Sequence, residues 1–560
     1  MSSAKEPVTR RFGNGLTVLI KEDKSHPVVS LQYWVGTGSM NEGHWQGSGL
    51  SHLLEHLVFK GTAHFSGQEL ARKVQERGGH WNAYTSVNRT VYYIDGPAES
   101  WQIFLNLLTE LVFFPTFPED EMEREKEVVR REMAMYADDP DSVAYQLLMQ
   151  TLYLKHPRRW PVLGERAAFD CLTRQDVLDY HASRYVPNNV VLSIAGDVDA
   201  AEILSHLELL VEDLKSRPLN REPIPHEPHQ FGSRRVRKEF AVPYSKLHLA
   251  WRLPCSTHPD TPALSALSSI LGGGRSARFY EKFHDRLGLV YSIEVHSNQS
   301  ETDEGAFTIS MDVDRAQRDK VRDLVLQELR NLAEEDFTED LKRVCKQTRV
   351  SRLRRRSSAS GVASEMGADW FGSRNLNLSS EWQEAIERVT TEDLHRVCST
   401  WLSSPNVTEV SLDPPGSNAG DEERASASAG TALSEHVLGN GMKVVIREDH
   451  RLPLAYACMA FKAGCRAENE HDAGVTDLMS ECLLKGTSTR SAADIARFLE
   501  DIGGAINTST GNNSLSVGCQ VLAEDLDAGL ELMADVVMNP SFPELSLIHI
   551  SEPTRLQLIS

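Results

Sequence analysis

The segment GLSHLLEHLVFKGT, residues 49–62, predicts a helix that begins after a glycine and carries His52, Glu55 and His56 in an H-x-x-E-H string. Residues four apart in a helix lie on one face, about 6 Å apart along the axis. His52 and His56 can therefore bind one zinc ion together. Glu55 lies on nearly the same face, where we expect it to take a proton from a zinc-bound water rather than to bind the metal.

A catalytic zinc site also needs a third protein ligand and one open position. The segment PEDEMEREKEVVRREMAMYADD, residues 118–139, predicts an acidic helix in which Glu125 and Glu132 are seven residues apart. That spacing places both carboxylates on one face, two turns apart. We predict Glu132 as the third metal ligand and Glu125 as a carboxylate that orients the ligands without touching the metal.

The H-x-x-E-H string on its own is a weak signal, because it also arises by chance in a chain of this length. The alternative is a surface helix whose two histidines have ordinary hydrogen-bond partners. The glycine before the helix, its apolar face and the acidic helix further along the chain favour the metal site.

The chain also repeats itself over a long period. Residues 11–23 read RFGNGLTVLIKED and residues 437–449 read VLGNGMKVVIRED, which are both strand, Asn-Gly turn and strand. Further pairs follow in register: ERGGHWNAYT and EDIGGAINTST, then FFPTFPE and VMNPSFPE. When the copies are aligned on their shared Lys-Gly-Thr, Asp477, Ser480 and Glu481 replace the H-x-x-E-H residues. No imidazole remains, so we expect no zinc in the second copy.

Strand patterns interleaved with long helices predict an α+β fold, in which helices cover mostly antiparallel sheets in repeated two-layer sandwich domains, two domains per half. We assign residues 1–215 to a zinc-binding catalytic domain and 216–412 to a second, homologous domain. Residues 413–433 are rich in Pro, Gly, Ala and Ser, which predicts a flexible linker. Residues 434–545 form a partial third domain, the inactive copy of the first.

The last residues depart from the repeat. The copy predicts a second acidic helix after Glu544, but the chain reads LSLIHISEPTRLQLIS. The string SLIHISEPTR resembles a translated sequencing adapter, so we expect residues 546–560 to be a non-native tail on a truncated chain.

Composition excludes several classes of function. The chain has 560 residues, a formal net charge of −21 and a pI of about 5.4. Such an acidic balance argues against nucleic acid as a partner. The sequence has no apolar run long enough for a membrane span and no apolar signal-peptide region, so we expect a cytoplasmic location. Its eight cysteines include no C-x-x-C pair, which favours free thiols in a reducing compartment.

Three segments, HLLEHLVFKGT, GGHWNAYTSVNRTVYY and EREKEVVRREM, resemble the pitrilysin/insulinase family of inverted-motif zinc metallopeptidases. The resemblance covers residues 8–412, and more weakly 434–545. In the family pattern the third ligand is a Glu at the spacing that separates His56 from Glu132, which agrees with the choice made from helix geometry.

The resemblance implies how a peptide substrate is held. Family members add the substrate as an extra strand at the sheet edge near the segment that reads Asn82-Ala83-Tyr84-Thr85 here. Backbone hydrogen bonds then give affinity without demanding a sequence. Asn82 can pair with the substrate backbone and Ala83 leaves room for it; the alternative is an ordinary strand after a Gly-Gly turn.

The resemblance therefore implies a zinc-dependent endopeptidase that cuts unstructured peptides or small proteins, with zinc as its cofactor. An inactive second half of the same chain would close over the active half. The alternative is a non-catalytic scaffold or assembly subunit with the same fold. The presence of His52, Glu55, His56 and Glu132 together argues against it, because a scaffold has no need of all four.

Overall fold

The computed structural model describes residues 6–219, 223–299, 304–402, 406–415, 434–446, 454–464, 468, 474–502, 504–511 and 514–543. They belong to two compact units, one within Met1–Glu422 and one within Glu423–Ser560. The predicted tail, and all of the predicted linker after residue 415, lie outside the described residues. Among the described residues, no helix is both long enough and apolar enough to cross a membrane.

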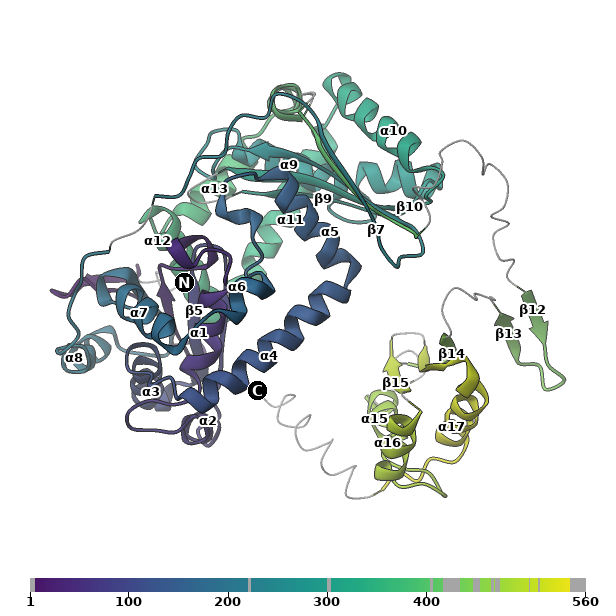
Figure 1. Ribbon diagram of the computed structural model, residues 1–560, viewed down its shortest axis with the longest axis horizontal. Coiled ribbons are helices and arrows are strands. Elements are labelled where there is room, and N and C mark those ends of the chain that lie inside the picture. The colour runs from purple at the N-terminus through teal and green to yellow at the C-terminus, as the bar shows by residue number, and fades with distance from the viewer. Residues whose placement is uncertain are drawn as a thin grey trace. The chain divides into compact units, whose positions relative to one another are not determined.

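A six-stranded sheet, of which Figure 1 labels β5, organises the first half of the larger unit, and its strand order is β1-β2-β6-β3-β5-β4. Its strands are β1 (Val8–Arg11), β2 (Thr17–Glu22), β3 (Val28–Val35), β4 (His80–Thr85), β5 (Thr90–Pro97) and β6 (Val190–Gly196). All neighbours are antiparallel except β2 and β6, which run parallel. Among the strands that the structure describes, β4 pairs with β5 alone, so it is an edge strand of this sheet.

Helices cover one face of this sheet and bury a common core with it. The helices of this half are α1 (Leu50–Val58), α2 (Gly67–Gln75), α3 (Trp101–Phe113), α4 (Glu119–Asp138), α5 (Pro140–Leu152), α6 (Arg166–Asp170), α7 (Arg174–Arg184) and α8 (Ala200–Leu210). In α1 the residues Leu50, Leu53, Leu54 and Leu57 are fully buried. Their spacing of three and four residues forms one apolar stripe, which fixes the side that faces the core.

A second sheet, of five strands, follows in the order β7-β11-β8-β10-β9. Its strands are β7 (Arg234–Glu239), β8 (Ser245–Leu253), β9 (Val290–Asn298), β10 (Gly305–Val313) and β11 (Thr408–Asp413), with helices α9 (Thr261–Gly272), α10 (Arg318–Asn331), α11 (Thr338–Arg355), α12 (Ala359–Ser373), α13 (Leu378–Glu387) and α14 (Thr391–Val397). Only β7 and β11 run parallel. The order and directions repeat those of the first sheet without β1, and confirm the predicted α+β class.

Each of the two sheets of the larger unit is also covered by one helix from the other half of that unit. Helix α5 packs on β8 and β11 of the second sheet, and α12 packs on β3 and β6 of the first. Leu148 joins a buried cluster with Val410, and Ala363 joins one with Trp34. The Ser193 hydroxyl donates to the Ala363 carbonyl at 2.7 Å. The exchanged helices therefore cover the second face of each sheet and hold the two halves of the unit together.

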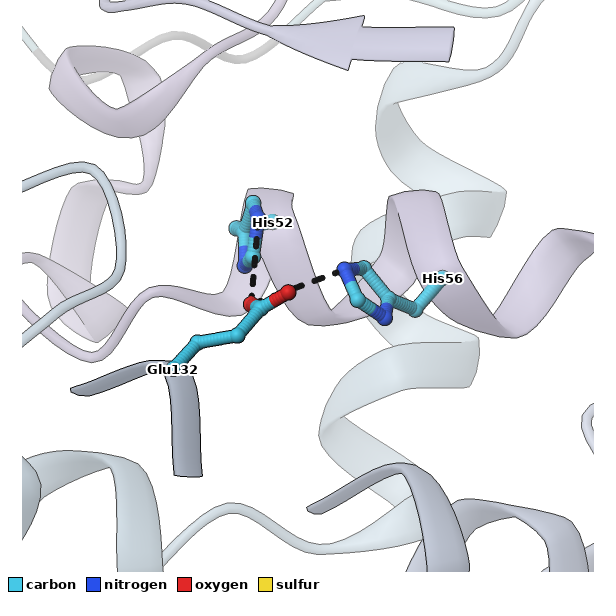
Figure 2. Close-up of side chains that lie close together, drawn as sticks. All are labelled: His52, His56 and Glu132. Atoms are coloured by element: carbon cyan, nitrogen blue, oxygen red, sulfur yellow. Dashed lines mark ion pairs between the residues drawn. The ribbon is translucent and has the colours of Figure 1, made fainter. Parts of the chain in front are cut away.

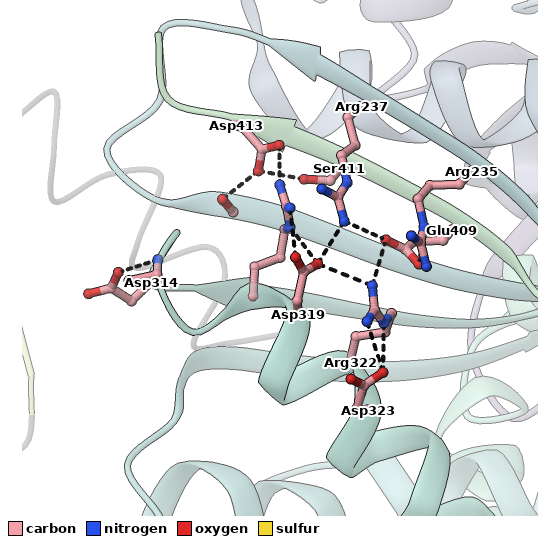
Figure 3. Close-up of polar contacts among 12 residues, drawn as sticks. Arg235, Arg237, Asp314, Asp319, Arg322, Asp323, Glu409, Ser411 and Asp413 are labelled. Carbon is pink, nitrogen blue, oxygen red and sulfur yellow. Dashed lines mark hydrogen bonds and ion pairs between the residues drawn. The ribbon is translucent and has the colours of Figure 1, made fainter. Parts of the chain in front are cut away.

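A cluster of charged side chains connects β11, an inner strand of the second sheet, to α10 (Figure 3). Arg318 of α10 pairs with Asp413 at the end of β11, and both side chains are 1% exposed. The hydroxyls of Ser245 and Ser411 each donate to Asp413 at 2.6 Å. The sequence predicts a linker that begins at residue 413, but Asp413 is the last residue of a buried strand.

The smaller unit repeats the first elements of the larger one. Its elements are β12 (Ser434–Val437), β13 (Lys443–Ile446), β14 (Leu454–Phe461), α15 (Val475–Leu483), α16 (Ala492–Asp501), β15 (Ala505–Thr510), β16 (Leu515–Leu522) and α17 (Leu526–Met538). This is the order of β1 to α3. The strand order β14-β16-β15 corresponds to β3-β5-β4, with β15 at an edge. The repeat of elements predicted from the sequence is therefore observed.

Candidate metal centre

Gly49 fixes where helix α1 begins. This residue adopts the left-handed conformation with φ 72°. A Cβ added to it would lie 2.0 Å from the carbonyl oxygen of Leu163, so a side chain does not fit. With the leucine stripe buried, His52, Glu55 and His56 lie on the opposite, partly exposed face.

The two imidazoles of α1 converge on one carboxylate of α4. The Nε2 atoms of His52 and His56 each lie 3.9 Å from Oε2 of Glu132. Figure 2 shows the Glu132 side chain reaching toward both rings from its own helix. One ligand atom from each residue can be chosen so that all three lie within 4.8 Å of one another. Among the described residues, this is the one such group of His, Cys, Asp or Glu side chains.

The donor atoms fit a zinc ion. Two imidazoles and one carboxylate, with a fourth position open, form a ligand set of the catalytic zinc type. Ligand atoms about 2.1 Å from a tetrahedral zinc lie about 3.4 Å apart, so a small inward movement suffices. Oε2 of Glu132 is buried and accepts no hydrogen bond from a described residue. Burial, with help from His56, lowers the pKa of His52 to about 4, which keeps its imidazole neutral as a ligand must be.

Glu125 lies two turns before Glu132 on α4 and contacts His56 at Nδ1, the ring nitrogen that does not face Glu132. Oε2 of Glu125 is 3.0 Å from Nδ1 of His56, and Nζ of Lys60 is 2.6 Å from Oε1 of Glu125. Burial alone would raise the pKa of Glu125, but the hydrogen bonds from His56 and Lys60 outweigh it and the pKa is lowered. A carboxylate that accepts the proton on Nδ1 leaves Nε2 with its lone pair toward Glu132. This is the geometry that the predicted orienting role requires.

Glu55 is held by a residue of the edge strand. Oγ1 of Thr85, at the end of β4, donates to Oε2 of Glu55 at 2.5 Å. Burial raises the pKa of Glu55, which the Thr85 hydrogen bond partly opposes. Sequence reasoning missed Thr85 and Lys60 as partners. Both lie in the segments that carry the family resemblance, yet nothing in the pattern shows which side chain each would meet.

Asn82 and Ala83, the predicted peptide-binding residues, lie in edge strand β4. The Asn82 side chain is exposed and its Oδ1 accepts the backbone N–H of Ala83 at 2.8 Å. The structure thus brings both residues to the open edge of the sheet that ends at Thr85.

The corresponding helix of the smaller unit has the same local structure without the imidazoles. It begins after Gly474, which has φ 87°, and carries Asp477, Ser480 and Glu481 at the aligned positions. Thr510 at the end of β15 donates to Asp477 at 2.7 Å. The tie between the strand and the helix is therefore retained, while the ligand set is absent from this helix.

Comparison with known proteins gives two matching family descriptions. "Insulinase (Peptidase family M16)" matches residues 17–166 and 443–551, and "Peptidase M16 inactive domain" matches residues 172–347. An uncharacterised zinc protease of Rickettsia felis is 27% identical over 406 residues, which cover 70% of this chain and 94% of that protein. One of Mycobacterium tuberculosis is 30% identical over 299 residues, covering 52% of this chain and 67% of that protein.

A solved structure shows the same architecture. The crystal structure of a protease from Helicobacter pylori superposes with a TM-score of 0.67 at 26% identity. The match covers 73% of this chain and 100% of that one.

Proposed function

The chain belongs to the insulinase family of peptidases, peptidase family M16, and from that membership we propose that it is a zinc-dependent endopeptidase acting on unstructured peptides or small proteins. The observation that carries the proposal is the convergence of His52, His56 and Glu132, with Glu55 on the same helix face. Relatives that are named zinc proteases support it.

Each side chain has a distinct task in the proposed reaction. His52, His56 and Glu132 would hold the zinc ion, which when bound supplies a Lewis acid for the scissile carbonyl and acidifies water. Glu55 accepts the proton of the attacking water and passes it to the leaving amine. Its raised pKa suits it to both steps, because a carboxyl group with an ordinary pKa is a poor proton donor near neutral pH.

The open edge of β4 supplies the peptide-binding surface in this proposal. A substrate in extended conformation would pair with β4 as a seventh strand, through main-chain hydrogen bonds. A substrate carbonyl can replace Asn82 as the acceptor for the Ala83 N–H, and the freed amide can then bind the substrate backbone. Such binding selects for an unfolded segment rather than for a sequence. The second half of the chain, which lacks imidazoles on α15, would serve to enclose the substrate.

A peptidase assay with an internally quenched, unstructured peptide tests the proposal. We expect cleavage that a chelator abolishes and added zinc restores. Glu55→Gln should retain the metal and lose activity by about 10²-fold or more, because only the proton acceptor is removed. The matched control is Glu481→Gln at the aligned position of His56 in the second copy, which should cleave at the wild-type rate. Full activity of Glu55→Gln would exclude Glu55 as the base, and zinc-loaded wild type without any cleavage would favour the scaffold alternative.

A further inference from the structure

A cavity of about 700 Å³ lies at one end of the first sheet, away from the metal-binding residues. It is bounded by the starts of β2 and β6 and by the C-terminal end of the exchanged helix α12. Arg11, Asn41, Trp370, Phe371 and Arg374 are among its lining residues. None of the residues that line it is Asp or Glu, although the chain carries 80 acidic and 59 basic residues. The cavity is therefore a local exception to the acidic character of the protein.

The cavity holds N–H donors that lack acceptors. Neither the guanidinium of Arg11 nor that of Arg374 forms an ion pair or hydrogen bond with another described residue. The indole Nε1–H of Trp370 is buried and also has no partner among the described residues. Burial and the neighbouring guanidinium of Arg11 lower the pKa of Arg374. Two unpaired cations beside a buried donor are unfavourable alone, and a bound anion relieves both costs.

The backbone conformation of Arg374 is a second, independent indication of a functional site. Arg374 ends helix α12 in the left-handed conformation, with φ 59° and ψ 20°. Glycine is the usual residue at such a helix end, because a side chain there costs conformational energy. Backbone strain of this kind is typical of functional sites. Here it places a guanidinium on the cavity wall, where glycine would offer nothing to a ligand.

We propose that this cavity binds a small anion consisting of a carboxylate or phosphate attached to a planar ring. The planar donor forks of Arg11 and Arg374 match either anionic group. Trp370 and Phe371 provide an aromatic surface for the ring, and the Trp370 indole provides one further donor. The volume falls within the range of about 300–1,000 Å³ that is usual for small-molecule sites.

Isothermal titration of the full chain tests this site with three probes: phenyl phosphate, benzoate and inorganic phosphate. We expect one ring-bearing probe to bind saturably at one site per chain, and the tighter of the two identifies the anionic group. Inorganic phosphate should bind at least tenfold more weakly, because it lacks the ring. Arg11→Gln and Arg374→Gln should each weaken binding at least tenfold. The control is Arg72→Gln, an exposed arginine paired with Glu76, which should leave the affinity unchanged.

A further variant separates binding from folding. Arg374→Gly removes the guanidinium but suits the left-handed backbone, so we expect a raised thermal unfolding midpoint together with lost binding. The proposal is overturned if neither ring-bearing probe saturates, if inorganic phosphate binds as tightly as they do, or if the double variant of Arg11 and Arg374 binds like wild type. A lowered midpoint of Arg374→Gly with unchanged binding would show that Arg374 serves the fold alone.

Discussion

Thr85 donates a hydrogen bond of 2.5 Å to Glu55, and this bond joins edge strand β4 to the helix that carries both candidate imidazole ligands. The strand that would pair with a substrate and the carboxylate that would accept the water proton are thus in direct contact. The smaller unit also joins the aligned threonine to its helix, but at a different position: Thr510 donates at 2.7 Å to Asp477, which aligns with His52 and not with Glu55. A hydrogen bond between the strand end and the helix therefore belongs to the repeated fold, and the larger unit combines it with the candidate metal-binding face.

Replacement of Thr85 should separate catalysis from binding. Thr85→Val keeps the shape of the side chain but leaves Glu55 without its donor. We expect kcat to fall about tenfold or more, since a hydrogen bond to a charged group contributes about 1.5–3 kcal/mol, while KM stays nearly unchanged. Thr85→Ser, which retains the hydroxyl, should recover most of the activity. Steady-state kinetics on one peptide measure both constants. An equal loss in the Ser and Val variants would show that the methyl packing matters instead of the hydrogen bond.

Glu125 should affect metal affinity without binding the metal. Glu125→Gln keeps an acceptor near Nδ1 of His56 but removes the charge that holds the imidazole. Loss of such an outer partner typically weakens metal binding about 10–100-fold. Competition with a chromophoric chelator measures the affinity. Glu121→Gln is a suitable control, because this residue lies on the same helix and forms an ion pair with the exposed Arg124 instead of His56. Equal zinc affinity of the two variants would contradict the orienting role.

Metal content distinguishes the two copies of the helix. We expect one zinc per chain in the wild type. His52→Ala, His56→Ala or Glu132→Gln should lower the content sharply, because each removes one of the three predicted protein ligands. Asp477→Ala should change nothing, since no imidazole stands on its helix. Elemental analysis after dialysis measures the content; two zinc ions per chain, or full occupancy in the His56 variant, would contradict this assignment.

Local periodicity explains which parts of the site were predictable. His52 and His56 are four residues apart, and Glu125 and Glu132 are seven apart, so helix geometry alone places each pair on one face. The contact between these two helix faces depends on tertiary packing. The spacing between His56 and Glu132, which matches the family pattern, was the signal for it. The contact of Thr85 with Glu55 depends on the position of β4 beside α1, and no periodicity encodes it.

The same reasoning applies to the fold. Alternating strand and helix patterns predicted the α+β class, and the repeated segments predicted the element order of the smaller unit. The exchange of α5 and α12 was not predicted, because an apolar helix face does not show which sheet it covers. Ala363 packs by Trp34, far away in the sequence, and only the folded chain reveals the pairing.

The buried pair of Arg318 and Asp413 should stabilise the larger unit in a pH-dependent way. Asp413→Asn removes the buried carboxylate partner of Arg318 and leaves the half-exposed Asp319, 3.2 Å away, to compensate its charge, so we expect a loss of about 1.5–3 kcal/mol in the free energy of unfolding of this unit at pH 7. Burial raises the pKa of Asp413, but hydrogen bonds from Ser245, Ser411 and Arg318 outweigh it and lower the pKa. A lowered folded-state pKa means that the stabilisation is fully present above the unfolded value of about 3.9 and is lost as the pH falls through the folded value. The difference between wild type and variant should therefore be constant from pH 7 to about pH 5 and shrink below pH 4.

The control is Asp323→Asn. Asp323 pairs with Arg322 of the same cluster but is 67% exposed, so its replacement should cost less than about 1 kcal/mol. Urea titrations of both variants at several pH values measure these differences, and equal losses in the two variants at pH 7 would show that the buried pair does not stabilise the end of β11.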